Sequence, residues 1–293
     1  MEPSLKPKMY LDKWDQLRKT IYSSDRLTLL NNIPILDLKI FNKEITTSKN
    51  QSIILYKDIS KKLKNEYEYL INLEFNPIKI EKPNFNFAEP SSGNLKEYDS
   101  EKVDNTGNVN IWPSEEILAI YLILNKNRLE NKKIIELGAG FSGLAALITA
   151  KTIPSAYFTI TDGNTKCVEY LKRNIQSNGL DNNTEGKVLL WDRNIKPSLS
   201  EFQFKYDYVI ISDCIFFKNY HEDLIETIYN LISDDGICIM IAPPRGDSLD
   251  IFLNLAVKKF KIYKSKEEIK FYSCCLDTTN TSFSPFYIEL YKN

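Results

Sequence analysis

The stretch KKIIELGAGFSGLAALITAKTIPSAYFTITD, residues 132–162, decides the fold of this chain. It opens with a short apolar run, residues 134–137, which is β-branched at its start and too short for a helix, so we predict a buried strand. A glycine-rich turn at residues 138–143 comes next, and residues 144–150 favour a helix because they are helix formers without a breaker. A second apolar run ends at Asp162. This order of strand, glycine turn, helix, strand and acid predicts a nucleotide-binding βαβ unit.

The chemistry of the glycine turn favours an adenosine-containing cofactor. Gly138 and Gly140 let the backbone turn sharply and let a ligand approach where a Cβ atom would clash. The following helix begins with unpaired N–H groups and a positive dipole end, which favour an anionic group. Asp162 ends the neighbouring strand, where its carboxylate can accept hydrogen bonds from ribose hydroxyls. A nicotinamide or flavin dinucleotide and S-adenosylmethionine both fit, and an ordinary turn with Asp162 as a solvated cap is the alternative.

The composition argues against several classes of protein. The 293 residues allow one large domain or two modest ones, and 43% hydrophobic with 26% charged residues is ordinary for a globular protein. A formal net charge of −1 gives no reason to expect nucleic-acid binding. The apolar runs fall short of the roughly 18 residues that a membrane span needs, and residues 1–10 lack the apolar segment of a signal peptide.

The cysteine and histidine content argues against metal sites. The five cysteines show no CxxC spacing, so neither a disulfide framework nor a zinc site is predicted. The single histidine, His221, excludes a site built from several histidines. We therefore expect a metal-free monomer in a reducing compartment, the cytoplasm, with the nucleus as a further location.

Beyond Asp162, the apolar pattern predicts a doubly wound α/β sheet. Helices are expected at residues 164–178, 221–233 and 248–257, and further strands at 186–191, 206–213, 236–242, 260–263 and 286–291. Seven strands that alternate with helices make a Rossmann-like sheet. Ligands of such sheets bind at the carboxyl ends of the strands. In this chain those ends carry Gly138, Asp162, Trp191, Asp213 and Pro243.

Four short motifs at these strand ends resemble a known family. The strings E-L-G-A-G (136–140), T-D-G-N (161–164), L-L-W-D (189–192) and S-D-C-I-F (212–216) are similar to the seven-β-strand methyltransferases of family 16, which modify protein lysines. The strings N-T-G-N-V (105–109), W-P-S-E-E (112–116) and A-P-P-R-G (242–246) resemble the group within this family that methylates calmodulin. The resemblance implies a class I methyltransferase fold, S-adenosylmethionine as cofactor and a calmodulin lysine as substrate, with up to three methyl groups added.

The same resemblance implies the residues of the site. The cofactor-binding set is Trp112, Glu136, Gly138, Ala139, Gly140, Asp162, Trp191 and Ser212. In this family the glycine turn surrounds the methionine part of the cofactor, with Glu136 steadying the turn and Trp112 closing over it. Asp162 is then expected to bind the ribose and Trp191 to lie beside the adenine. Asp213 and Phe216 occupy the family's D-x-x-Y/F motif, which faces the substrate lysine.

Lysine methylation requires that Asp213 and its neighbours hold an amine in line with a methyl group. A free lysine has a pKa near ~10.4, so the site must desolvate it and promote loss of a proton. Asp213 is the candidate to orient the lysine, and capping of the following loop is the alternative. Phe216 and Phe217 can wall a lysine channel or belong to the core. A phenylalanine at position 216, where many relatives have tyrosine, favours di- and trimethyl products because it offers no hydroxyl to a partly methylated amine.

Three other features have open interpretations. Arg245 can meet acidic residues of a partner or cap a carbonyl, and the six lysines of residues 258–270 can steer an acidic partner or form a solvated surface. Cys214 is expected to be a small buried thiol, since no histidine is near it in the sequence. Lysine methylation of another protein, an NAD-dependent oxidoreductase and a non-catalytic binding protein of the same fold are the rival functions. The late glycine motif and the lack of a Tyr-x-x-x-Lys constellation disfavour the oxidoreductase.

The first 105 residues carry no nucleotide motif, and we interpret them as an N-terminal α+β extension. Residues 11–21 favour an amphipathic helix, residues 35–41 and 52–56 favour strands, and residues 61–73 fit a helix or a strand pair. A turn signal at residues 104–108 ends this region. We expect residues 1–105 to form a substrate-recognition lobe and residues 106–293 to form the methyltransferase domain.

Overall fold

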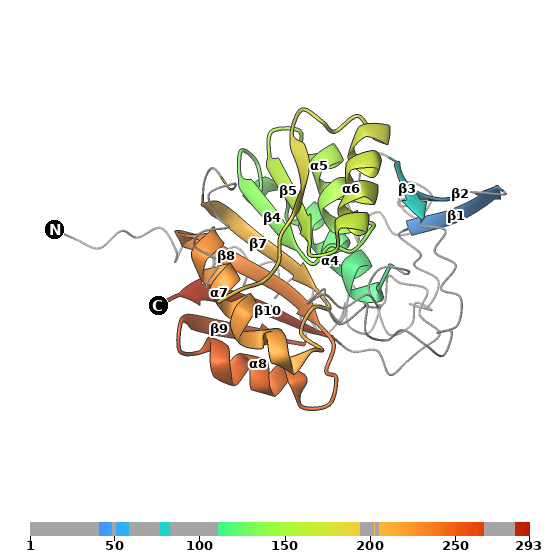
Figure 1. Ribbon diagram of the computed structural model, residues 1–293. Helices are drawn as coiled ribbons and strands as arrows, with labels where there is room; N and C mark the ends of the chain where they lie inside the picture. The colour runs from blue at the N-terminus through green and yellow to red at the C-terminus, as the bar shows by residue number, and fades with distance from the viewer. Residues whose placement is uncertain are drawn as a thin grey trace, which may run out of the picture.

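The computed structural model describes residues 77–82, 111–193, 202, 205–266 and 285–293, together with the course of two strands at 41–48 and 51–58. Its centre is a seven-stranded sheet with helices on both faces (Figure 1). The strands of this sheet are β4 (Lys133–Leu137), β5 (Tyr157–Asp162), β6 (Thr184–Val188), β7 (Tyr206–Ser212), β8 (Ile232–Ala242), β9 (Phe260–Ser265) and β10 (Phe286–Lys292). The helices are α4 (Pro113–Leu124), α5 (Leu144–Thr152), α6 (Thr165–Ser177), α7 (His221–Leu231) and α8 (Ser248–Ala256), with short 3₁₀ helices η3 (Lys126–Arg128) and η5 (Lys218–Tyr220). Within these ranges, no helix is both long and apolar enough to cross a membrane.

The order of the strands indicates which edge of the sheet can bind a ligand. The order is β6-β5-β4-β7-β8-β10-β9. β4 pairs in parallel with β5 on one side and with β7 on the other, so the direction of winding reverses at β4. Ligands of open α/β sheets bind beside such a switch point, at the carboxyl ends of the strands. The predicted seven-stranded Rossmann-like sheet is confirmed, although the sheet is mixed because β10 runs antiparallel to both β8 and β9.

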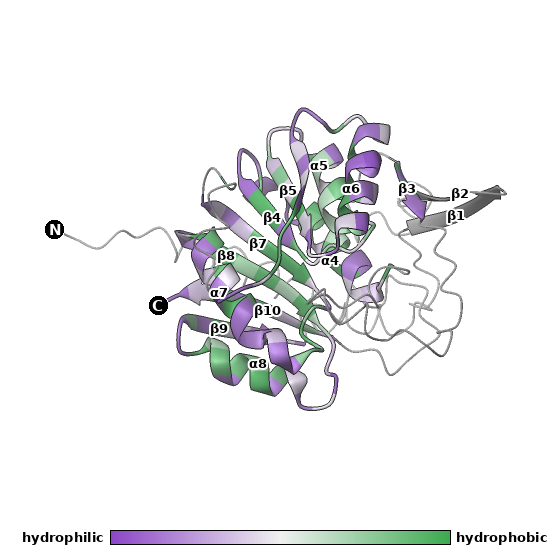
Figure 2. Cartoon of the chain, viewed as in Figure 1, coloured by the Kyte–Doolittle hydropathy of each residue, from purple (hydrophilic) through white to green (hydrophobic). Residues whose placement is uncertain are grey.

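Alternate residues of each strand serve the two faces of the sheet. Ile134 and Ile210 pack into the apolar cluster that includes residues of α4, α5 and α6. Ile135 and Val209, their neighbours in sequence, pack into the opposite cluster with residues of α7 and α8. Successive strand side chains point to opposite faces, which is why these strands read as continuous apolar runs. Figure 2 shows the result, with apolar strands at the centre of the molecule and hydrophilic residues on the outer turns of α6.

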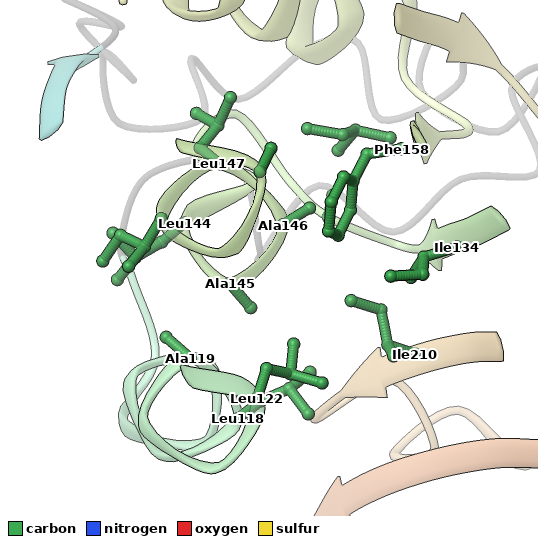
Figure 3. Close-up of a cluster of buried hydrophobic side chains, with 14 of the residues drawn as sticks. Leu118, Ala119, Leu122, Ile134, Leu144, Ala145, Ala146, Leu147, Phe158 and Ile210 are labelled. Atoms are coloured by element: carbon green, nitrogen blue, oxygen red, sulfur yellow. The ribbon is translucent and has the colours of Figure 1, made fainter. Parts of the chain in front are cut away.

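Helices α4 and α5 pack closely because small residues lie between them. Ala119 of α4 and Ala145 of α5 face the gap between the two helices, and Leu118 and Leu122 fill the space toward the sheet (Figure 3). All four side chains are fully buried. This contact fixes the N-terminal end of α5, next to the glycine turn, against the middle of α4.

A three-stranded antiparallel sheet lies beside α6 and consists of β1 (Phe41–Ser48), β2 (Gln51–Asp58) and β3 (Ile78–Lys82), in that order (Figure 1). Ile78 and Ile80 of β3 are fully buried in the core cluster of α4–α6. Asn178 pairs with the backbone of Lys79, accepting from its N–H at 3.0 Å and donating to its carbonyl at 2.7 Å. The carboxamide of Asn174 accepts from Glu81 N–H at 2.8 Å. The last of the three strands is thus attached to α6 by apolar burial and by three hydrogen bonds.

The predictions for the N-terminal region have mixed outcomes. The strand expected at residues 52–56 lies within β2. The helix expected at 11–21 and the segment 61–73 lie outside the described residues, as does most of the strand expected at 35–41. The structure instead has a strand, β1, that begins at Phe41. The division of the chain at residue 105 stays a prediction.

Candidate functional site

The glycine turn between β4 and α5 lies at the carboxyl edge of the sheet. Gly138, Gly140 and Gly143 all have left-handed backbones, with φ angles of 66°, 59° and 52°. A Cβ atom built on Gly138 would lie 2.6 Å from the Cys214 sulfur and 3.1 Å from a ring carbon of Trp191. The turn therefore needs glycine, and it brings Gly138, Trp191 and the loop after β7 into contact. Because β6 ends at Val188, Trp191 lies in the loop after this strand and not in the strand itself as predicted.

Asp162 ties the glycine turn to the end of β5. One carboxylate oxygen accepts from Gly140 N–H at 2.9 Å, and the other accepts from Asn164 N–H at 2.8 Å. The backbone N–H of Ala139 donates to the carbonyl of Thr161 at 2.9 Å, which adds a second link between turn and strand. Asp162 is only 8% exposed. The predicted ribose acceptor thus also holds the turn in place.

Two buried carboxylates lie behind the turn, at the start of α5. Glu115 accepts from the Ser142 hydroxyl at 2.7 Å and from Leu144 N–H at 2.6 Å. One oxygen of Glu136 accepts from Ala146 N–H at 3.1 Å, and the other has no partner within the described residues. Burial raises the pKa of the Glu136 carboxyl well above its ordinary value, and the nearby charge of Glu115 adds to this rise.

These carboxylates correct one expectation. The sequence predicted that the N-terminus of α5 would receive an anionic group of the cofactor, but Glu115 and Glu136 of the chain itself accept its N–H groups. A pyrophosphate would find these N–H groups already paired with acidic side chains of the chain itself. The arrangement therefore disfavours a dinucleotide and leaves S-adenosylmethionine as the candidate. Sequence reasoning missed Glu115 and Ser142, although Glu115 lies in the W-P-S-E-E string and Ser142 lies in the glycine turn.

The loop after β7 carries Asp213 in a buried ion pair. Asp213 is 8% exposed, and its two oxygens accept from Arg245 Nε at 3.0 Å and from an Arg245 terminal nitrogen at 2.6 Å. The guanidinium carbon lies 5.4 Å from the Trp112 ring centroid and 5.9 Å from that of Phe216. Burial raises the pKa of Asp213, and the hydrogen bonds and charge of Arg245 oppose this rise. Arg245 thus brings Trp112, Asp213 and Phe216 together, a role that differs from both interpretations of its sequence position.

Asp213 has an unusual backbone. Its φ of +52° lies in the left-handed region, where aspartate and asparagine are tolerated better than most residues other than glycine. Its N–H donates to the carbonyl of Ile241 at 3.0 Å, so the residue is fixed between the ends of β7 and β8. The sharp turn directs the next residues along the edge of the sheet.

The residues around Asp213 complete this part of the site. Ser212 is the last residue of β7, and its carbonyl accepts from the Cys214 thiol at 3.1 Å. Burial of the sulfur raises the pKa of the Cys214 thiol well above its ordinary value, so the thiol is protonated. The residue as a whole is half-buried and not fully buried as predicted. The rings of Phe216 and Phe217 lie 4.6 Å apart, and Phe217 is 42% exposed, so Phe217 is not a core residue.

His221 anchors the loop that carries the D-x-x-F motif. His221 Nε2 lies 2.9 Å from the carbonyl oxygen of Ile215, and the Ser248 hydroxyl donates to the same oxygen. The imidazole is 1% exposed and packs edge-on against Phe252, while Nδ1 has no partner among the described residues. The predicted helix at 248–257 is present as α8, and Ser248 is its first residue, whose hydroxyl reaches across to the loop.

We predict that His221 stays neutral in the folded chain, with its proton on Nε2. Burial lowers the pKa of this imidazole, and Lys218 lowers it further. The unfolded chain then binds a proton more readily, so the contribution of His221 to stability is present above a pH of about 6.5 and is lost as the pH falls toward the folded-state pKa. Because the chain has one histidine, ¹⁵N NMR reports it directly as a single Nε2–H tautomer with a titration midpoint below ~6.5.

A matched variant isolates this effect on stability. The free energy of unfolding of wild type and of His221→Gln is compared by urea denaturation between pH 5 and pH 8, and the advantage of wild type is expected to shrink as the pH falls. A midpoint at or above that of a free histidine, or a difference that does not change with pH, would contradict the prediction.

Comparison with known proteins places the chain in a family. The family described as lysine methyltransferase matches residues 95–259. Calmodulin-lysine N-methyltransferase of Arabidopsis thaliana is 38% identical over 156 residues, which cover 52% of this chain and 50% of that protein. Protein N-lysine methyltransferase METTL21A of Danio rerio is 26% identical over 58% of this chain and 78% of that protein. A solved precorrin-6y C5,15-methyltransferase from Geobacter metallireducens GS-15 aligns with a TM-score of 0.45 at 12% identity, covering 67% of this chain and 95% of that one.

The matched region contains every residue of the site described above. It includes both ends of the ion pair, Asp213 and Arg245, the glycine turn and the two carboxylates at α5. S-adenosylmethionine is the methyl donor of this family, and the N–H groups at the start of α5 are paired with Glu115 and Glu136 and not open to a pyrophosphate. Since the match extends over more than half of its residues, the chain belongs to the lysine methyltransferase family.

Proposed function

We propose that this chain transfers methyl groups from S-adenosylmethionine to a lysine of calmodulin. The observation that carries the proposal is the group formed by Asp213, Trp112 and Phe216, an acid and two aromatic rings that already surround a cationic side chain. Such a group suits the ammonium of a lysine. The choice of calmodulin is supported by the 38% identity to the Arabidopsis enzyme, a match that spans about half of that enzyme's length.

The residues of the site have distinct tasks in this reaction. S-adenosylmethionine, when bound at the glycine turn, supplies an electrophilic methyl group on a positively charged sulfur. Asp213 receives the lysine ammonium and orients its nitrogen toward the turn, which Cys214 links to the Asp213 loop. Trp112 and Phe216 shield the ammonium from bulk water, which lowers its pKa, so its proton passes to the solvent and the neutral amine remains as nucleophile. Holding the reacting atoms close to a line lowers the barrier by up to about 7 kcal/mol.

Phe216 affects the number of methyl groups that the substrate lysine can receive. It offers no hydroxyl to hold the N–H of a mono- or dimethylated amine in a resting position, while an aromatic face stabilises the methylated cation by roughly 0.5–2 kcal/mol. We therefore propose that the product extends to trimethyl-lysine. Intact mass of the product decides this, since accumulation of monomethyl-lysine alone would contradict it.

The surface outside the site suggests where the protein substrate lies. We propose that residues 1–105, whose strand β3 lies beside α6, help to select the substrate. Most of this segment lies outside the region that matches the family. The lysines that follow α8 are a weaker candidate, because Lys259 pairs with Glu226 at 2.7 Å and Lys264 lies 3.7 Å from Asp250. These acids of the chain itself reduce the field that the lysines offer to an acidic partner. Residues 267–270 of this basic stretch lie outside the described residues.

Incubation with purified, unmethylated calmodulin and S-adenosylmethionine tests the proposal. Intact mass spectrometry of calmodulin is expected to show steps of one methyl mass, absent without S-adenosylmethionine and absent with the Asp213→Asn variant. Thermal denaturation is run in parallel, where S-adenosylmethionine but not NAD should raise the melting temperature. Cofactor binding without any change in calmodulin mass would reject calmodulin as substrate, and labelled methyl transfer to proteins of a cell extract would then identify another.

A further inference from the structure

Arg245 approaches Asp213 in the way that a substrate lysine must. The side chain of Asp213 is 6% exposed and that of Arg245 is 41% exposed, so a cation reaches from the surface to a buried carboxylate. Both oxygens of Asp213 are taken by the guanidinium, at 3.0 and 2.6 Å. A second cation that approached the same carboxylate along this path would meet the guanidinium and its charge.

The aromatic partners of the site are engaged by the same residue. The Arg245 guanidinium lies within ~6 Å of the rings of Trp112 and Phe216, the range in which a cation is attracted to an aromatic face. The acid and both rings proposed to receive the lysine therefore already bind an arginine of the chain.

The segment that carries Arg245 can move without disturbing the core. Pro244, Arg245, Gly246 and Asp247 are all exposed, between the end of β8 and the start of α8. Gly246 has a φ of +58° and open space around the position of a Cβ atom. An ion pair between Asp247 and Lys218 links this segment to η5, also at the surface. Rotation of the Arg245 side chain toward solvent would leave every buried apolar contact intact.

We propose that Arg245 occupies the lysine position in the free enzyme and that the target lysine displaces it. This inference rests on the proposed lysine transfer at Asp213. The apparent affinity for substrate is then reduced by the fraction of enzyme in which Asp213 is occupied. An isolated lysine competes poorly with a tethered, bidentate arginine. Arg245 therefore favours protein substrates that make further contacts outside the site.

Kinetics of Arg245→Ala with calmodulin, compared with wild type, test the inference. The KM for calmodulin is expected to fall by about three- to tenfold. Rates are measured from pH 7 to pH 9, because loss of the guanidinium lets burial raise the pKa of Asp213 further. Arg245→Lys, which keeps a cation but loses the bidentate fork, should give an intermediate KM.

Added guanidinium distinguishes a competing occupant from a positioning partner. At tens of millimolar, against an equal concentration of NaCl, it should inhibit Arg245→Ala competitively with calmodulin and leave wild type unaffected. If Arg245→Ala instead loses kcat and guanidinium restores it, Arg245 positions Asp213 and the inference is wrong. An unchanged KM in Arg245→Ala would overturn it equally.

A binding measurement keeps this test independent of the substrate. The indole N–H signal of Trp112, assigned with Trp112→Phe, should shift when guanidinium is titrated into Arg245→Ala, but not into wild type or into Arg245→Ala with Asp213→Asn. The same spectra report whether each variant is folded, and Arg245→Gln replaces Arg245→Ala if the latter is not. Absence of any shift in a folded Arg245 variant overturns the inference, whereas failure of wild type to methylate calmodulin affects only the proposed substrate.

Discussion

Replacing Asp213 by asparagine is expected to lower kcat/KM for the protein substrate by about 100-fold or more. Asparagine keeps the shape of the side chain but cannot balance the charge of an ammonium. A hydrogen bond to a charged group contributes roughly 1.5–3 kcal/mol, and a cation left without its partner in a desolvated site adds to the loss. Affinity for S-adenosylmethionine should change little, because the side-chain hydrogen bonds of Asp213 are to Arg245 and not to the glycine turn.

The stability of this variant should stay within about 1 kcal/mol of wild type. Burial disfavours the charged form of Asp213, so removal of the charge offsets loss of the ion pair, and Arg245 is exposed enough to be solvated. Asparagine also tolerates the left-handed backbone of this position, whereas alanine adds about 1–2 kcal/mol of backbone strain. Asparagine is therefore the informative substitution, and Asp213→Ala is the control for strain.

Single-turnover methylation of calmodulin, calorimetric binding of S-adenosylhomocysteine and urea unfolding separate these effects. Activity of Asp213→Asn near that of wild type would show that the carboxylate does not hold the lysine. Loss of cofactor affinity in parallel with activity would place the defect in the glycine turn instead.

The parts of the site that could be predicted are those that local sequence determines. The turn glycines and Asp162 could be predicted because a short apolar run, a glycine-rich turn and an acid at the end of a strand follow one another within about one βαβ unit. Asp213 follows from the same reasoning, since a nearly continuous apolar run in a parallel sheet must end at the edge where ligands bind. Strand alternation also explains why Ile134 and Ile135 could both be assigned to a core.

The parts that could not be predicted depend on contacts between distant segments. Arg245 lies 32 residues from Asp213 and Glu115 lies 29 residues from Leu144, and no spacing in the sequence indicates either pair. Arg245 had two reasonable interpretations because an arginine after a strand end has many potential acceptors. Only the position of β8 beside β7 brings it to Asp213. The antiparallel position of β10 between β8 and β9 is likewise not indicated locally, because nothing in residues 286–292 shows the direction in which the strand runs.

The N-terminal sheet shows the same limit. Strand β3 has the alternating pattern of a half-buried strand, with Ile78 and Ile80 inward. The three prolines of residues 76–94 instead favour a loop, so the sequence did not predict this strand. Its attachment depends on Asn174 and Asn178, which read as polar residues at the end of a surface helix. Their carboxamides pair with backbone N–H and C=O groups of β3, as a neighbouring strand would. This role depends on the position of α6 beside β3 and cannot be inferred from the sequence of either.

Gly138→Ala is expected to lower the affinity for S-adenosylmethionine by about 10- to 100-fold and to destabilise the fold. The backbone of Gly138, at a φ of +66°, costs alanine about 1–2 kcal/mol. In addition, the new methyl group would lie 2.6 Å from the Cys214 sulfur and 3.1 Å from the Trp191 ring, so these side chains must shift. Both lie against the turn that is proposed to bind the cofactor, and Cys214 is the neighbour of Asp213. Calorimetric titration with S-adenosylmethionine and thermal unfolding measure the two effects.

Two variants divide this loss between strain and steric conflict. Gly179 has nearly the same φ, +68°, but nothing within 4 Å of a built Cβ atom, so Gly179→Ala should lose stability without losing cofactor affinity. Combining Gly138→Ala with Cys214→Ala removes the closest contact and should restore part of the affinity, because the contact with Trp191 and the strain remain. Cys214→Ala alone should bind the cofactor like wild type. If Gly138→Ala and Gly179→Ala behaved alike in cofactor binding, the approach of Cys214 and Trp191 to the turn would have no part in shaping the site.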